Sequence, residues 1–190
     1  MNLRFRRSGL DFSRRRRKVN KTLAKEVGTW IGEIAIAVLF ALVLVYFVGY
    51  RADVVGPSML GTLAEGDEVL VNRFVYKLTQ PKTNDIVVFF PNGNEKSHLY
   101  IKRVIGVPGD TVQITEGILY VNGVPQPTPD GFSLMEDAGK AAAPLTLAPG
   151  EYFVLGDNRN HSIDSRFAEV GIIPAASIAG KVITGRTPFR

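Results

Sequence analysis

A serine on a turn is the first residue of this sequence whose side chain could carry chemistry. Ser58 stands in the stretch GPSMLGTL, residues 56–63, where a Gly-Pro turn would present its hydroxyl beside an apolar Met-Leu pair. A serine hydroxyl is a poor nucleophile until an adjacent base takes its proton. Ser58 is therefore either an ordinary surface-turn residue or a nucleophile, and the second interpretation requires a base elsewhere in the chain.

Lys102 is a candidate for that base. It follows Tyr100 and Ile101 in a presumed strand, so its stem has apolar neighbours. A free lysine has a pKa near ~10.4, but burial without a counter-ion can lower the pKa by up to ~3–5 units and leave a usable general base. The alternative is a strand lysine that extends its amine into solvent.

The third candidate stretch is the polar loop GDNRNHSIDSR, residues 156–166. Loops displayed by a rigid sheet are where functional sites usually lie. His161 and Asp164 could complete a triad with Ser58, although His161 stands among hydrophilic residues without apolar support. A calcium loop is disfavoured, because Asp157 and Asp164 lack the dense alternating spacing of an EF-hand and the two arginines would oppose a cation.

The elements that must position these residues have the pattern of strands. After residue 51 the apolar residues alternate or form short solid runs, and no long amphipathic helix is indicated. The predicted strands cover 67–71, 86–90, 100–105, 112–115, 118–121, 152–155 and 178–183. Gly and Pro turns favour antiparallel pairing, so we expect a mainly β domain with an antiparallel sheet. Residues 125–150, with five prolines and little periodicity, are predicted to be a surface insertion.

A long apolar run precedes this domain. Residues 34–50 are seventeen residues without a charge, and Trp30 lies at the other end of the run. About 20 apolar residues cross ~30 Å of hydrocarbon as a helix. The run is longer than the ~7–15-residue core of a cleavable signal peptide, and no small-residue cleavage site follows it. A transmembrane anchor is therefore predicted at 29–50, with a buried globular helix as the alternative.

Positive charge is concentrated before this run. Residues 1–25 hold ten Lys and Arg residues against Asp11, a net of +9, although the whole chain carries only +5. Such a run could bind nucleic acid, but its position favours a cytoplasmic orientation signal attracted to anionic lipid. We therefore expect the lipid bilayer, and no nucleic acid, as a partner. The predicted organisation is a cytoplasmic segment at 1–28, the anchor, and an extracytoplasmic domain at 51–190, a single-pass type II protein of the cell membrane.

The chain contains no cysteine. This excludes disulfides, thiolate metal sites and a cysteine nucleophile.

Four motifs, in this order behind an apolar anchor, resemble the bacterial type I signal peptidases. They are Ser-Met after the Gly-Pro turn, then GDEVLVNRF, KRVIGVPGD and GDNRNHSIDSR, and the similarity runs from Val54 to about Ile183. The resemblance implies a membrane-anchored serine endopeptidase that releases exported preproteins from their signal peptides after small residues, at sites of A-x-A type. It implies signal peptides as the binding partner and no metal or organic cofactor.

Site roles follow from the resemblance residue by residue. It implies that Ser58 is the nucleophile, that Lys102 is the general base, and that Ser162 hydrogen-bonds and orients the lysine amine. The positions that match supporting ion pairs are Asp164 with Arg166 and Arg103 with Asp157. The positions that match the lining of shallow substrate pockets are Val54, Met59, Leu63, Tyr100 and Ile101.

The sequence departs from the family pattern at two glycines. Family members often place a serine, whose hydroxyl is a second oxyanion donor, where this chain has Gly56, and they usually have a proline where it has Gly61. Two rival functions remain: a self-cleaving repressor-type serine–lysine protease, which carries a DNA-binding head in place of the anchor, and a catalytically silent module that binds exported chains. A complete set of Ser58, Lys102 and Ser162 argues against the silent module.

Overall fold

The computed structural model describes residues 21–91, 98–128 and 131–184. The chain divides into two compact units, Met1–Val43 and Leu44–Arg190.

Helix α1 (Lys21–Val48) contains the apolar run. Its window Lys25–Val43 has a mean hydropathy of 1.8, is long and apolar enough to cross a membrane, and has no buried residue. Large apolar side chains are exposed around it, among them Trp30, Ile36 and Phe40. A helix that is apolar on all sides is normally buried in a protein core or in a membrane.

Helix α1 ends at Val48, two residues before the end of the predicted anchor. Gly49 and Tyr50 belong to strand β1 (Gly49–Asp53), which pairs with β2 (Glu68–Asn72). Tyr50 packs against a hydrophobic core cluster of the second unit. An apolar run does not by itself show where a helix ends and a half-buried strand begins.

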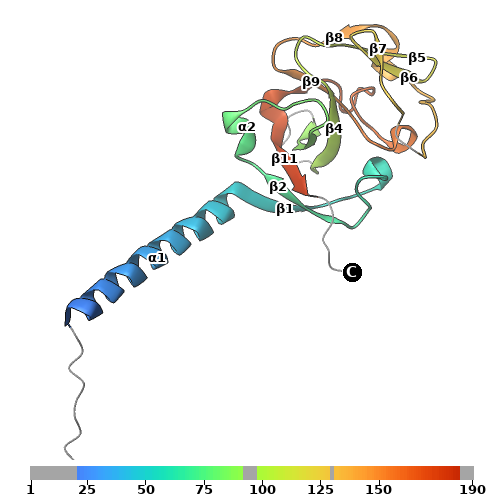
Figure 1. The fold of residues 1–190 in the computed structure, drawn as a ribbon. Helices are drawn as coiled ribbons and strands as arrows, with labels where there is room; N and C mark the ends of the chain where they lie inside the picture. Colours follow the sequence, from blue (N-terminus) through green and yellow to red (C-terminus); the bar gives the residue numbers. More distant parts are fainter. Residues whose placement is uncertain (1–20, 92–97, 129–130, 185–190) are drawn as a thin grey trace, which may run out of the picture. The chain divides into compact units, whose positions relative to one another are not determined.

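The second unit is built on two antiparallel sheets (Figure 1), which confirms the predicted fold class. The larger sheet has the order β1-β2-β11-β3-β4-β9-β10 and the smaller one β7-β6-β5-β8. In Figure 1 the strands of the smaller sheet gather at the end of this unit opposite β1 and β2. The remaining strands of the larger sheet are β3 (Ile86–Phe89), β4 (Tyr100–Gly106), β9 (Glu151–Leu155), β10 (Ile173–Pro174) and β11 (Ile178–Thr184). Those of the smaller sheet are β5 (Thr111–Thr115), β6 (Ile118–Val121), β7 (Val124–Pro125) and β8 (Leu145–Thr146).

Short helices connect these strands. They are η1 (Pro57–Met59), α2 (Val75–Leu78), η3 (Gly139–Ala142), η4 (Arg159–His161) and η5 (Ala175–Ser177).

The hairpin of β5 and β6 forms as the sequence predicts. Thr115 pairs with Ile118, and the two turn residues Glu116 and Gly117 have φ of 52° and 76°. Positive φ at both central positions is the requirement of the tight turn whose twist matches the flanking strands.

The 125–150 segment is not confined to the surface, contrary to the prediction. Met135, Ala141 and Leu147 are buried in a core cluster with residues of β5 and β6. The apolar residues of this segment are sparse and follow no regular period. Burial is predicted from such a period, so the sequence did not reveal that these residues are buried.

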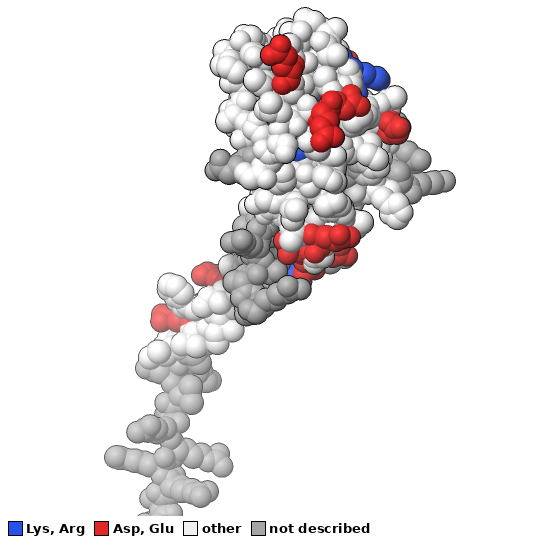
Figure 2. Space-filling model, turned by 90° about the vertical axis from the view of Figure 1, so that its right-hand side faces the viewer, with Lys and Arg blue, Asp and Glu red and all other residues white. Residues whose placement is uncertain are grey.

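Acidic side chains predominate over basic ones on the face drawn in Figure 2. This agrees with the location of the positive charge in the first 25 residues, which leaves the rest of the chain at about −4.

Candidate active site

Ser58 lies on the turn η1, between β1 and β2. The turn is entered through Gly56, whose φ of 80° is a left-handed conformation that favours glycine. Asn158 fastens the turn to the rest of the domain, because its backbone N–H donates to the Ser58 carbonyl (3.1 Å) and its side-chain amide donates to the Pro57 carbonyl (3.2 Å). The hydroxyl of Ser58 therefore stands on a turn that is held by hydrogen bonds to two adjacent carbonyls.

Lys102 reaches Ser58 from strand β4. Its Nζ lies 2.7 Å from Ser58 Oγ, and the residue is only 5% exposed. Burial lowers the pKa of Lys102 to about 8, although the carboxylates of Asp164 and Asp157 act in the opposite direction. A lysine with this pKa is partly neutral near neutral pH, so it can accept a proton from the hydroxyl that it contacts.

The described residues do not assemble a histidine triad. His161 Nδ1 lies 3.3 Å from Asn158 Oδ1, and the ring is exposed at the rim of the site. Asp164 is committed to Arg166 and to the N–H of Gly156. The base placed beside the hydroxyl is the lysine.

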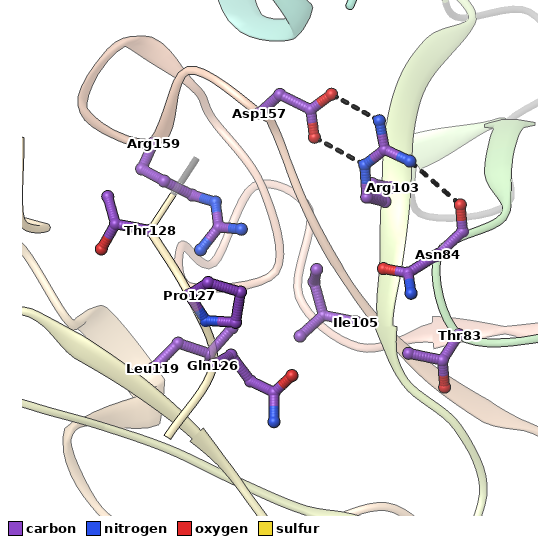
Figure 3. A pocket seen from close by; sticks show the side chains of 10 residues that line it. All are labelled: Thr83, Asn84, Arg103, Ile105, Leu119, Gln126, Pro127, Thr128, Asp157 and Arg159. Carbon is purple, nitrogen blue, oxygen red and sulfur yellow. Dashed lines mark hydrogen bonds and ion pairs between the residues drawn. The ribbon is translucent and has the colours of Figure 1, made fainter. Parts of the chain in front are cut away.

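Arg103 and Asp157 form a bidentate ion pair (Figure 3). Arg103 Nε and Nη2 lie 2.8 and 2.7 Å from the two carboxylate oxygens of Asp157. The hydroxyl of Thr62 donates to the same carboxylate at 2.6 Å, and Arg103 also donates to the Asn84 carbonyl. The pair thus connects β4, which carries Lys102, to the loop after β9 and to the segment that follows η1.

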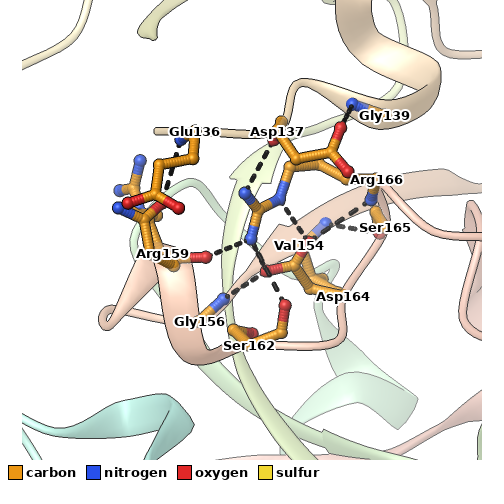
Figure 4. A network of polar contacts seen from close by, with 11 residues as sticks. Glu136, Asp137, Gly139, Val154, Gly156, Arg159, Ser162, Asp164, Ser165 and Arg166 are labelled. Carbon is orange, nitrogen blue, oxygen red and sulfur yellow. Dashed lines mark hydrogen bonds and ion pairs between the residues drawn. The ribbon is translucent and has the colours of Figure 1, made fainter. Parts of the chain in front are cut away.

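A second ion pair lies deeper in the loop (Figure 4). Asp164 is fully buried, and its carboxylate accepts from Arg166 Nε at 2.8 Å and from Nη2 at 3.0 Å. Arg166 also donates to the backbone carbonyls of Asp137, Arg159 and Ser162. One arginine therefore holds together three points of the chain around the 156–166 loop.

Ser162 is buried, but its hydroxyl makes no hydrogen bond to Lys102 in this structure. Ser162 Oγ has no hydrogen-bond partner among the described residues. Ser162 Oγ lies close to Gly156. A side chain at position 156 would collide with this hydroxyl and with the Ser58 carbonyl oxygen, which is 2.5 Å from the position that a Cβ would take. The expected hydrogen bond to the lysine amine is not formed here.

An open groove of about 630 Å³ runs past Ser58 and Lys102. It is lined by two continuous stretches, residues 50–55 and 98–102, together with Ser58, Met59, His161 and Ile163. Among the residues expected to form substrate pockets, Val54, Met59, Tyr100 and Ile101 line the groove. Leu63 is not among the lining residues of the groove; its side chain is 3% exposed and belongs to the same core cluster as Val54 and Met59, and its place in a substrate pocket stays a prediction.

Asn158 and Thr62 are site residues that the sequence alone did not reveal. Asn158 was one polar residue among many in its loop, and its role depends on two carbonyls that lie a hundred residues earlier in the chain. Thr62 contacts both members of the Arg103–Asp157 pair. No local signal marks such contacts, because they exist only after β4 and the loop meet the turn.

Comparisons with known proteins identify the family of this chain. The family model described as "Signal peptidase, peptidase S26" matches residues 27–185. Signal peptidase I T of Bacillus subtilis is 38% identical, over 84% of this chain and 86% of the relative. Signal peptidase IB of Staphylococcus aureus is 36% identical, over 88% of this chain and 93% of the relative. A crystal structure of a signal peptidase I from Enterococcus faecalis is 33% identical, with a TM-score of 0.44, over 56% of this chain and 98% of that one. The family model and the two relatives each cover most of the sequence, so the chain belongs to the signal peptidase I family and is a serine-type peptidase.

Proposed function

We propose that this protein is a membrane-anchored endopeptidase that removes signal peptides from exported preproteins, with Ser58 as nucleophile and Lys102 as general base. The observation that carries the proposal is the 2.7 Å contact between Ser58 Oγ and the amine of a buried lysine. A serine and a base within hydrogen-bond reach are the signature of covalent catalysis by a hydroxyl.

The reaction begins with the neutral amine of Lys102. Lys102 takes the proton of Ser58 as the oxygen attacks the scissile carbonyl, and it returns this proton to the leaving amine when the peptide bond breaks. An acyl ester on Ser58 remains. Water then attacks the ester, and Lys102 accepts a proton from this water. Lys102 passes that proton to the Ser58 oxygen as the ester bond breaks, and the product leaves as a carboxylic acid that ionises in solution.

Ser58 also supplies a donor for the oxyanion. It is the second residue of η1, and backbone N–H groups in the first turn of a helix have no intrahelical acceptor. Such a donor aimed at the developing negative charge contributes on the order of 3 kcal/mol. Gly56 provides no side-chain donor, so any second donor is a backbone group or water.

The substrate is an extended peptide with small side chains next to the cleaved bond. β1 is an edge strand, and the described partners of β4 on its β9 side begin only at Arg103. The groove lies against both free edges. A peptide strand can add to such edges through main-chain hydrogen bonds, and alternate side chains then enter shallow pockets. Apolar walls at Val54, Met59 and Ile101 favour small apolar side chains over large ones.

Helix α1 is the proposed membrane anchor. Its apolar window of 19 residues is exposed on all sides within the described structure, and the basic residues before it favour a cytoplasmic N-terminus. The peptidase unit then acts on the extracytoplasmic side. The segment distinguishes this chain from the repressor-type proteases, which carry a soluble DNA-binding head.

Cleavage of a purified preprotein tests the proposal. Detergent-solubilised wild-type protein is incubated with a preprotein carrying an A-x-A site, and the products are identified by mass spectrometry. The wild type is expected to cleave the preprotein after the second alanine. Ser58→Ala is expected not to cleave it, and the wild type is expected not to cleave a preprotein with Phe in place of that alanine. Folded wild-type protein that leaves the A-x-A preprotein intact would contradict the proposal, as would equal cleavage by Ser58→Ala.

A further inference from the structure

A second cavity lies beside the Arg103–Asp157 ion pair and is separate from the groove at Ser58 (Figure 3). Its volume is about 410 Å³, within the ~300–1,000 Å³ typical of small-molecule sites. The two lining sets share no residue, so the proposed peptidase mechanism does not use this cavity. Its walls combine charged, polar and apolar side chains: Thr83, Asn84, Arg103, Ile105, Leu119, Gln126, Pro127, Thr128, Asp157 and Arg159.

Arg159 is the unusual member of this lining. It is only 6% exposed, its guanidinium points into the cavity in Figure 3, and its Nε has no hydrogen-bond partner among the described residues. The ion pairs of the described chain do not include it. A buried polar group without a partner destabilises the folded protein, and a charged group does so more strongly, so the burial of Arg159 calls for an explanation.

The charges around Arg159 do not balance. Two carboxylates act on it, Asp157 and Asp164, but each is the bidentate partner of another arginine, Arg103 and Arg166 respectively. Three guanidinium groups thus face two carboxylates. Burial lowers the pKa of Arg159, and the two neighbouring arginines act in the same direction. The cluster lacks one negative charge, and the cavity is the open side from which it could be supplied.

The lining indicates the chemistry of the missing anion. A planar guanidinium with parallel N–H groups matches a carboxylate in bidentate geometry. Ile105 and Leu119 are buried apolar side chains of the same cavity, with Pro127 beside them, so they suit a short hydrocarbon body better than a fully hydrated ion. We propose that this cavity binds a small monocarboxylic acid with a short apolar body, whose carboxylate pairs with Arg159. The inference does not rest on peptidase activity.

Butyrate is a suitable probe, with butyramide as its neutral isostere and inorganic phosphate as an anion of different shape. The full chain, labelled with ¹⁵N-arginine in detergent micelles, is titrated while the side-chain Nε–H signals are followed. Arg159→Gln identifies the Arg159 signal by its loss. Butyrate is expected to shift this signal saturably in the wild type and in Ser58→Ala, whereas butyramide and phosphate leave it in place.

A matched pair of variants at Thr83 tests the location without disturbing the core. Thr83 is exposed and lines the cavity. Thr83→Glu adds a repelling carboxylate and is expected to weaken butyrate binding at least tenfold relative to Thr83→Gln, which has nearly the same volume. Arg73→Gln removes an exposed arginine outside the cavity and is expected to bind as the wild type does. These variants also decide the matter if Arg159→Gln does not fold.

The proposal is overturned if folded wild-type protein gives no saturable response to butyrate. It is equally overturned if Thr83→Glu binds butyrate as tightly as Thr83→Gln does. Equal binding of butyramide and butyrate would also overturn it, because the carboxylate of the ligand would then not contribute to binding. Binding of phosphate but not of butyrate would show a different anion site.

Discussion

At the scale of single residues, burial gives Lys102 the property on which the proposed mechanism depends. The amine is 5% exposed and its pKa is lowered to about 8 from an ordinary value of 10.5. Because the neutral amine is the base, the active fraction increases as pH rises through this pKa and is complete above it.

We therefore expect kcat/KM for preprotein cleavage to rise with pH, to be half-maximal near pH 8 and to level off at higher pH. Lys102→Arg keeps the positive charge but cannot deprotonate in this range, so it is expected to lose at least the ~10²–10⁴-fold that a general base contributes. Initial rates between pH 6 and pH 10 check both statements. A rate that is independent of pH, or that falls as pH rises from 7 to 8, would contradict the assignment.

Gly56 is the other residue whose chemistry can be isolated. A Cβ at this position would meet no atom within 4 Å, but the φ of 80° is strained for any other residue. Gly56→Ala and Gly56→Ser carry the same backbone strain, a cost of about 1–3 kcal/mol, and only the serine adds a hydroxyl near Ser58.

We expect the two variants to melt at similar temperatures, below the wild type. Gly56→Ser is expected to have the higher kcat, with an upper limit of the ~10²–10³-fold that one oxyanion donor can contribute. Thermal unfolding and steady-state kinetics measure the two effects separately. Equal kcat values for the serine and alanine variants would show that a hydroxyl at position 56 does not reach the oxyanion.

At the scale of elements, the site depends on how the 156–166 loop is fastened. Asn158 joins the loop to the turn η1 through two backbone carbonyls, those of Pro57 and Ser58. It contacts no group that reacts, so we regard it as a positioning residue.

Asn158→Ala removes the hydrogen bond to Pro57 and leaves the one from its backbone. We expect kcat to fall by up to about tenfold, as for loss of one hydrogen bond, with little change in KM or melting temperature. Asn160→Ala is the control, because Asn160 is bonded to Leu134 and Glu136 and not to the turn. If the two variants have the same kcat, Asn158 does not position Ser58.

The Asp164–Arg166 pair determines the stability of the same loop. Asp164→Ala leaves Arg166 buried without its counter-ion, and breaking a buried pair in this way costs about 3–5 kcal/mol. Glu68→Ala is the contrasting variant, because the Arg51–Glu68 pair is exposed, and it is expected to cost less than about 1 kcal/mol. Denaturant unfolding followed by circular dichroism compares them. A smaller loss for Asp164→Ala than for Glu68→Ala would contradict the structural role.

At the scale of the whole molecule, the absence of cysteine makes the proposed topology directly measurable. Ser8→Cys places a thiol in the basic N-terminal segment, and Glu136→Cys places one at an exposed position of the peptidase unit. With intact cells, or with spheroplasts if an outer membrane is present, a membrane-impermeant maleimide is expected to label only position 136. Both positions should react after detergent lysis. Labelling of position 8 alone would reverse the predicted orientation.

Much of the architecture was predictable from local patterns. The strands that became β2 to β6, β9 and β11 follow from short apolar runs and turn residues, because burial of one or both faces imposes that pattern. The apolar run over α1 is equally plain from composition. The exceptions were Gly49 and Tyr50, which continue the apolar run but turn into β1, and the core residues of the 125–150 segment, which lack a period.

The sequence by itself determined which residues could act: a serine on a Gly-Pro turn, a lysine among apolar neighbours and a loop rich in ion-pairing residues. Only the tertiary structure decided which of them meet. Pairing of β3 with β4 and packing of η1 against the loop bring Ser58 Oγ to 2.7 Å from Lys102 Nζ and leave His161 at the rim. The tertiary structure also buries Leu63 in the core. It leaves Ser162 without the expected hydrogen bond to Lys102 and leaves Arg159 without a hydrogen-bond partner for its Nε among the described residues. Contacts between residues 44 to 101 positions apart, and the desolvation that lowers the pKa of a lysine, are properties of the packed chain and have no signature in local sequence.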